Sequence, residues 1–81
     1  MEHVVVEREF EQPVTDEDLQ AMADRASGCY ENLRVTRIRS YLSLDRKRMV
    51  CEYLAPDAES VRNASDRAKI PYVRVWTATM L

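Results

Sequence analysis

Four short stretches of the chain have the pattern of strands: residues 3–8 are β-branched at their centre, residues 35–42 and 72–79 alternate between two faces, and residues 48–54 follow a short polar connection. The first strand is expected at His3 to Arg8, before Gln12-Pro13, because proline ends strand pairing. Residues 35–42 and 48–54 flank a short polar connection and predict an antiparallel hairpin. Residues 72–79 predict the last strand.

Apolar residues recur every three or four positions in two other segments, which predicts two helices. Thr15 is followed by three acidic residues and is expected to cap the first helix. This helix should run to about Glu31, with Asn32 in the left-handed conformation that often ends a helix. Ala55-Pro56-Asp57 predicts the start of a second helix, whose stripe of small residues suits close packing on a sheet. Ile70-Pro71 should end it.

The order of these elements is strand–helix–strand–strand–helix–strand, which predicts an α+β, ferredoxin-like βαββαβ domain over residues 1–81. A chain of 81 residues has room for one core only. Its four-stranded antiparallel sheet should carry both helices on one face. The alternation assigns to that helix side Val4, Val6, Ile38, Cys51, Tyr53, Val73 and Val75, and to the open side Val5, Glu7, Arg37, Arg39, Tyr41, Val50, Glu52, Leu54, Tyr72, Arg74 and Trp76.

The mixture of aromatic, aliphatic and charged residues on the open side resembles a protein interface more than a solvated surface. A domain of this size also obtains only a few kcal/mol from its own core, roughly 3–5, and many such domains gain more by oligomerising. We therefore expect a homodimer that forms through the open sheet face.

The net charge, the apolar runs and the cysteines of the chain indicate which cellular compartment and which binding partners to expect. Twelve basic and 14 acidic residues give a net charge of −2, so neither nucleic acid nor an anionic membrane is an expected partner. The chain begins without a basic and apolar leader and has no apolar run long enough to span a bilayer, which favours the cytoplasm. Cys29 and Cys51 are expected to be unpaired hydrophobic residues in such a reducing compartment.

The single histidine limits the chemistry that one subunit can perform. Serine nucleophiles have no histidine base within the chain apart from His3, so no residue is assigned to catalysis or to an organic cofactor, and a non-catalytic protein is favoured over an enzyme. His3 is the third residue, and a free amino terminus in this arrangement can hold Ni²⁺ or Cu²⁺ in a square plane of nitrogen ligands. The alternative is that His3 simply opens the first strand, with its backbone tied into the sheet.

Several short motifs resemble a small bacterial domain-of-unknown-function family of ferredoxin-like proteins that includes nickel-binding members. The motifs are Val6-Glu7-Arg8, Ser40-Tyr41, Cys51-x-Tyr53-x-Ala55-Pro56-Asp57, and Val61-Arg62 followed by Ala68 and Pro71. The resemblance implies a dimer packed through the open sheet face and a capacity to bind nickel. If nickel binds, His3 is the natural nitrogen ligand, with Glu2, Glu7 or groups of the other subunit beside it.

Three functions are compatible with these patterns. The first is a small cytosolic metal-binding dimer without catalysis, with nickel as the metal. The second is a cofactor-independent enzyme of the dimeric α+β barrel type, in which Tyr41, Tyr53, Trp76 and a buried carboxylate would line a cleft between helices and sheet. The third is a non-catalytic interaction module that uses the open sheet face.

Overall fold

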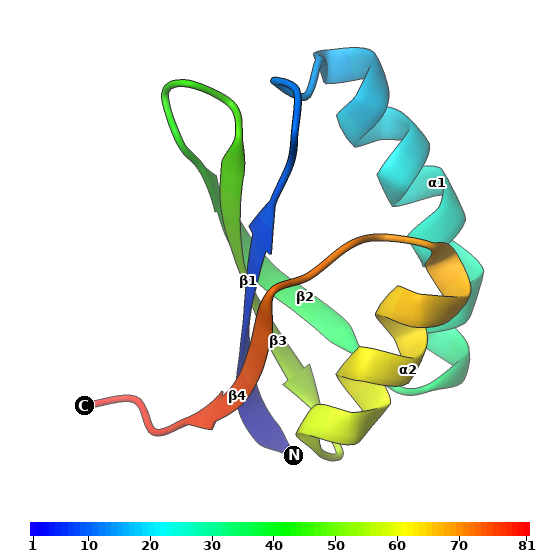
Figure 1. Cartoon of the computed structure of the whole chain (residues 1–81). Helices are drawn as coiled ribbons and strands as arrows, with labels where there is room; N and C mark the ends of the chain where they lie inside the picture. Colours follow the sequence, from blue (N-terminus) through cyan, green and yellow to red (C-terminus); the bar gives the residue numbers. More distant parts are fainter.

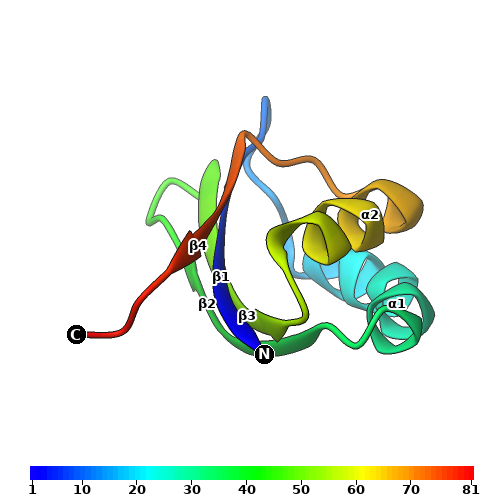
Figure 2. The same ribbon diagram turned by 90° about the horizontal axis from the view of Figure 1, so that it is seen from below.

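The computed structural model describes residues 1–81 and confirms the ferredoxin-like order of elements. The sheet is antiparallel and its strands lie in the order β2-β3-β1-β4. Both helices cover one face of the sheet, and the other face is open, as Figures 1 and 2 show. No helix is long and apolar enough to cross a membrane. The elements are β1 (Glu2–Glu9), α1 (Asp16–Asn32), β2 (Thr36–Leu42), β3 (Arg48–Ala55), α2 (Ala58–Ala68) and β4 (Arg74–Ala78).

The helix starts follow the sequence signals. The Thr15 hydroxyl accepts a hydrogen bond from the Asp18 backbone N–H at 3.0 Å, and the Asp18 carboxylate accepts one from the Thr15 N–H at 2.9 Å, a complete capping box. Asp57 caps α2 by accepting from the Ser60 N–H at 2.7 Å. The end of α1 differs from the prediction: Asn32 is the last helical residue, and Arg34 has the left-handed conformation, with φ of 60°.

These capping carboxylates are expected to make the domain sensitive to acid. Backbone N–H donors lower the pKa of Asp18 and of Asp57 below the usual range. A lowered folded-state pKa means that the stabilisation is present above the unfolded-state pKa of about 4 and is lost as the pH falls below it. The fall in urea midpoint between pH 6 and pH 3 should be smaller in Asp57→Asn than in the wild type. Asp24→Asn, the same substitution in the middle of α1, should show the same fall in urea midpoint as the wild type.

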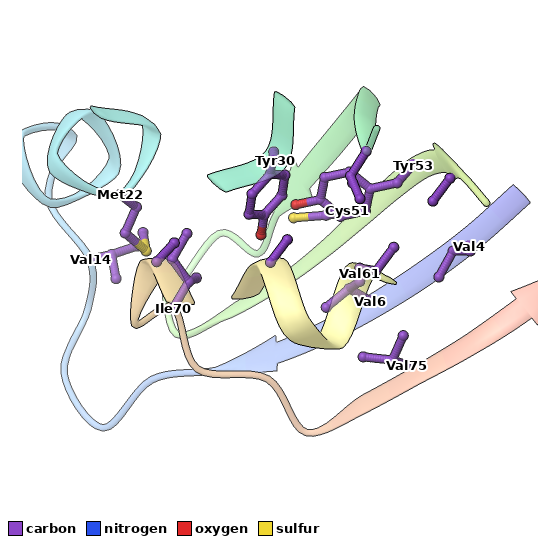
Figure 3. Packing of buried hydrophobic residues seen from close by; sticks show 14 residues of the cluster. Val4, Val6, Val14, Met22, Tyr30, Cys51, Tyr53, Val61, Ile70 and Val75 are labelled. Carbon is purple, nitrogen blue, oxygen red and sulfur yellow. The ribbon is translucent and has the colours of Figure 1, made fainter. Parts of the chain in front are cut away.

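The core lies between the sheet and both helices. Val4 and Val6 of β1 and Val61 of α2 are fully buried, and Figure 3 shows them facing one another with Val75 of β4. Small buried residues of α2, among them Ser65 and Ala68, let its backbone approach the sheet, as its stripe predicted. The backbone of α1 lies nearer to α2 than to the strands, and its Met22 and Tyr30 side chains reach into the core.

Two details of the sheet correct the sequence analysis. A β-bulge in β2 lies between Arg37, which pairs with Tyr53, and Arg39, which pairs with Glu52. The extra residue places Arg37 on the helix side instead of the open side, and it leaves Ile38 outside the core.

The last strand is also shorter than predicted. It begins at Arg74, and Tyr72, assigned to the open side, packs against the core instead, while Val73, assigned to the helix side, is half exposed. The carbonyl of Pro71 accepts a hydrogen bond from the Arg8 side chain. This bond holds the segment before β4 on the helix side of the sheet, and the strand begins three residues later at Arg74.

Candidate functional site

The only histidine of the chain lies on the open face of the sheet. His3 sits in β1 between Leu54 of β3 and Ala78 of β4. Its Nε2 atom lies 3.3 Å from the Glu52 carboxylate. Arg39 also contacts this carboxylate, with 3.6 Å between Nε and Oε1. Glu52 is therefore the shared partner of one imidazole and one guanidinium group on this face.

The other predicted metal ligands do not join His3 in this conformation. Glu2 precedes His3 in the strand, so its side chain points to the opposite side of the sheet. Glu7 is on the same face as His3 but four residues further along, about 13 Å away at the usual rise of a strand. The Glu7 carboxylate instead accepts a hydrogen bond from the Trp76 indole at 2.9 Å and lies 3.5 Å from Arg74 Nε.

One subunit alone supplies too few ligands for a nickel site on this face. No group of three or more His, Cys, Asp or Glu side chains comes together in the chain. The imidazole of His3 and the carboxylate of Glu52 are nonetheless donors that Ni²⁺ accepts, and it prefers four ligands in a tetragonal arrangement. His3 and Glu52 therefore fit nickel by their chemistry, and together they supply two of the four ligands.

The amino-terminal arrangement meets a different obstacle. A square plane built on the α-amine needs the backbone nitrogens of Glu2 and His3 as ligands. Both residues lie within β1, and His3 has a partner strand on each side. Binding of this kind would require the first residues of β1 to leave the sheet.

Exposed apolar side chains surround the His3–Glu52 pair. Leu54 and Val50 of β3, Tyr41 of β2 and Trp76 of β4 are between 37% and 55% exposed, and all lie on the open face. A cluster of this kind is typical of a surface that another protein covers.

A second polar cluster lies on the helix side, around Arg8. Arg8 follows Val4 and Val6 on the inward face of β1 and is only 2% exposed. Its Nη2 atom donates to the hydroxyl groups of Tyr30 and Tyr53, each at 3.1 Å, and lies 3.4 Å from Ser65 Oγ. From the sequence, Arg8 was expected to end the first strand and was part of a motif, and its place on the same face of β1 as Val4 and Val6 was the signal that could have identified it as buried.

No carboxylate neutralises Arg8. None of the ion pairs of the chain includes it, and its hydrogen-bond partners are hydroxyl groups, a carbonyl and the Cys51 side chain. Burial opposes its charge, but the neighbouring Tyr53, Tyr30 and Cys51 outweigh burial and raise the pKa of Arg8. Burial also raises the pKa of Tyr53, despite the opposing effect of Arg8. Arg8 is thus a buried positive charge that faces hydroxyl groups and no carboxylate.

This cluster borders a cavity of about 520 Å³ between α1 and the β2–β3 half of the sheet. Figure 3 shows the Tyr30 and Tyr53 side chains beside Cys51, three of the residues that line it. Of the residues predicted to line such a cleft, Tyr53 does so, whereas Tyr41 and Trp76 lie on the open face, and no acidic residue lines the cavity.

Comparison with known proteins agrees with the fold. The family described as nickel responsive protein SCO4226-like matches residues 5–77. The crystal structure of SCO4226 from Streptomyces coelicolor A3(2) superposes with a TM-score of 0.86 over 98% of both chains, at 14% sequence identity. That similarity demonstrates the shared fold. No curated protein sequence matches the chain significantly.

Proposed function

We propose that this chain, which belongs to the SCO4226-like family of nickel responsive proteins, is a cytosolic homodimer that binds Ni²⁺ between the open sheet faces of its two subunits. Each subunit would contribute His3 and Glu52, and the metal would be held without catalysis. The observation that carries the proposal is the 3.3 Å contact between the imidazole and this carboxylate on the face that lacks helices.

The ligand count supports a site shared by two subunits. Two copies of the pair supply two nitrogen and two oxygen ligands, which is the number that a tetragonal nickel site needs. The two carboxylates also neutralise the two charges of the metal. Arg39 would have to release Glu52 on binding, which is feasible because its side chain is half exposed and the ion pair is long.

The same face supplies a reason for two subunits to meet. It carries exposed aliphatic and aromatic side chains next to charged pairs, a mixture that protein interfaces also have. In an isologous dimer each residue meets the symmetric surface of its partner, so a pair near the two-fold axis meets its own copy.

Calorimetric titration of Ni²⁺ into tag-free protein tests this assignment. We expect one metal ion per two chains, and a loss of affinity of about 10-fold or more in His3→Ala and in Glu52→Gln, because each change removes two ligands from the shared site. Glu7→Gln, a matched change on the same face outside the pair, should bind nickel as the wild type does.

The same titration separates the shared site from one built on the α-amine. An amino-terminal extension removes the α-amine from a position next to His3 but leaves the His3 side chain on the sheet. Affinity that survives the extension, with one metal ion per two chains, supports the proposal. One metal ion per chain, bound only without the extension, would place nickel at the amino terminus and overturn the shared site.

A further inference from the structure

We propose that the cavity between α1 and the β2–β3 half of the sheet binds a small organic acid, with the apolar part of the ligand in the cavity and its carboxylate at Arg8. This site lies on the opposite side of the sheet from the proposed nickel site and is independent of it. The family description assigns no ligand to it.

The shape of the cavity follows from the position of α1. The backbone of this helix lies nearer to α2 than to the strands. Its short residues Ala23, Ala26 and Ser27 line the gap beside the larger Leu19, Met22 and Tyr30, and the short side chains leave part of it empty. Eleven of the 15 residues that line the cavity are hydrophobic, and its volume of about 520 Å³ lies within the range of small-molecule sites. Ser27 and Arg37 are exposed and form part of its mouth.

The buried Arg8 in the lining of the cavity favours a negatively charged ligand. Arg8 is buried without a carboxylate, and burying an uncompensated charge is costly. Its hydrogen bonds to Pro71 and to the hydroxyl groups use one hydrogen of Nη1 and those of Nη2, and Cys51 is a further side-chain partner, so at least one of its five N–H donors is left for a ligand. A carboxylate can accept a hydrogen bond from this donor and supply the missing charge.

One charge and an apolar wall favour a carboxylate over a phosphate. Phosphate esters carry about 1.5 to 2 negative charges at neutral pH, and a single buried guanidinium would leave part of that charge uncompensated. The positive Arg37 at the mouth favours the approach of an anion to the cavity. A fatty acid of medium chain length combines one carboxylate with a body that is entirely apolar.

The hydrogen bonds of Arg8 also have a structural role, because they connect β1 with α1, α2, β3 and the segment before β4. A neutral donor could make such bonds without the cost of a buried charge. The structural role of these hydrogen bonds therefore does not account for a positive charge at this position, whereas binding of a negatively charged ligand does.

Calorimetric titration with decanoate and with decanol, both in the presence of a metal chelator, tests the proposal. We expect decanoate to bind at one molecule per chain and decanol to bind at least about 10-fold more weakly, because only the acid pairs with Arg8. Arg8→Met should weaken decanoate binding by about 30-fold or more. Arg67→Met, the same change on an exposed position of α2, should not weaken it.

Ala26→Leu supplies a test that leaves Arg8 intact. The larger side chain occupies the cavity from α1 and should abolish decanoate binding while the far-ultraviolet circular dichroism stays unchanged. Equal affinity for acid and alcohol, unchanged decanoate binding in Ala26→Leu, or no decanoate binding to the wild type would each overturn the proposal. Because nickel is chelated, these outcomes are independent of the metal site.

Discussion

Replacing Tyr53 with alanine is expected to lower the free energy of unfolding by about 3 to 5 kcal/mol, the usual cost of removing a buried aromatic ring. Tyr53 is 3% exposed, and its ring lies against that of Tyr30 with 5.4 Å between the ring centres. Its hydroxyl also accepts a hydrogen bond from buried Arg8. The stability of a domain of 81 residues is roughly 4 to 12 kcal/mol, so the variant should be close to unfolding at room temperature.

Urea unfolding followed by circular dichroism measures this loss. Tyr53→Phe is the matched variant, because it keeps the ring and removes only the hydroxyl that Arg8 contacts. Its cost should be smaller, about 1 to 3 kcal/mol, which is the penalty for leaving a buried donor without one of its acceptors. If the two variants lose the same stability, the packing of the ring contributes nothing and the expectation is wrong.

Replacing Val50 with lysine is expected to dissociate the proposed dimer without unfolding the subunit. Val50 is 37% exposed on the open face and pairs with Glu7 and Tyr41, so a lysine there gains a neighbouring carboxylate within its own sheet. Between two subunits it would place a desolvated charge on each side of the interface. We expect the dissociation constant to rise about 100-fold or more, because unfavourable charges at an interface cost several kcal/mol.

Analytical ultracentrifugation over a range of concentrations measures the association. Leu44→Lys is the control, because Leu44 is fully exposed in the β2–β3 connection and not on the strands of the open face. This variant should dimerise as the wild type does. A Val50→Lys protein that remains dimeric would show that subunits meet elsewhere, and a wild type that is monomeric at micromolar concentration would remove the shared nickel site as well.

The fold could be predicted because local signals and global order agree along the chain. The Thr15 cap, the alternation of Val4 and Val6, and the prolines that end elements each act over a few residues and leave little freedom in topology. The bulge in β2 was missed because one additional residue without glycine changes the pairing partner and leaves no clear mark in the sequence.

The candidate sites were harder to predict than the fold. The pairing of His3 with Glu52 depends on the register of β1 against β3, which alternation alone does not fix. Arg8 occupies an inward position, but a charged residue is ordinarily expected outside, so its burial becomes visible only with the partners around it. The cavity depends on how far α1 stands from the sheet, a distance set by packing against α2.

The bulge in β2 also has a consequence for how copies of this protein avoid aggregating. Strand β2 lies at one edge of the sheet, where unpaired backbone groups can recruit a further strand from another molecule. The irregularity between Arg37 and Arg39 interrupts the regular row of backbone donors and acceptors, and two arginines beside it repel an identical edge. Growth into extended, fibre-like sheets is disfavoured at this edge, which is compatible with the proposed association of two copies through the broad face.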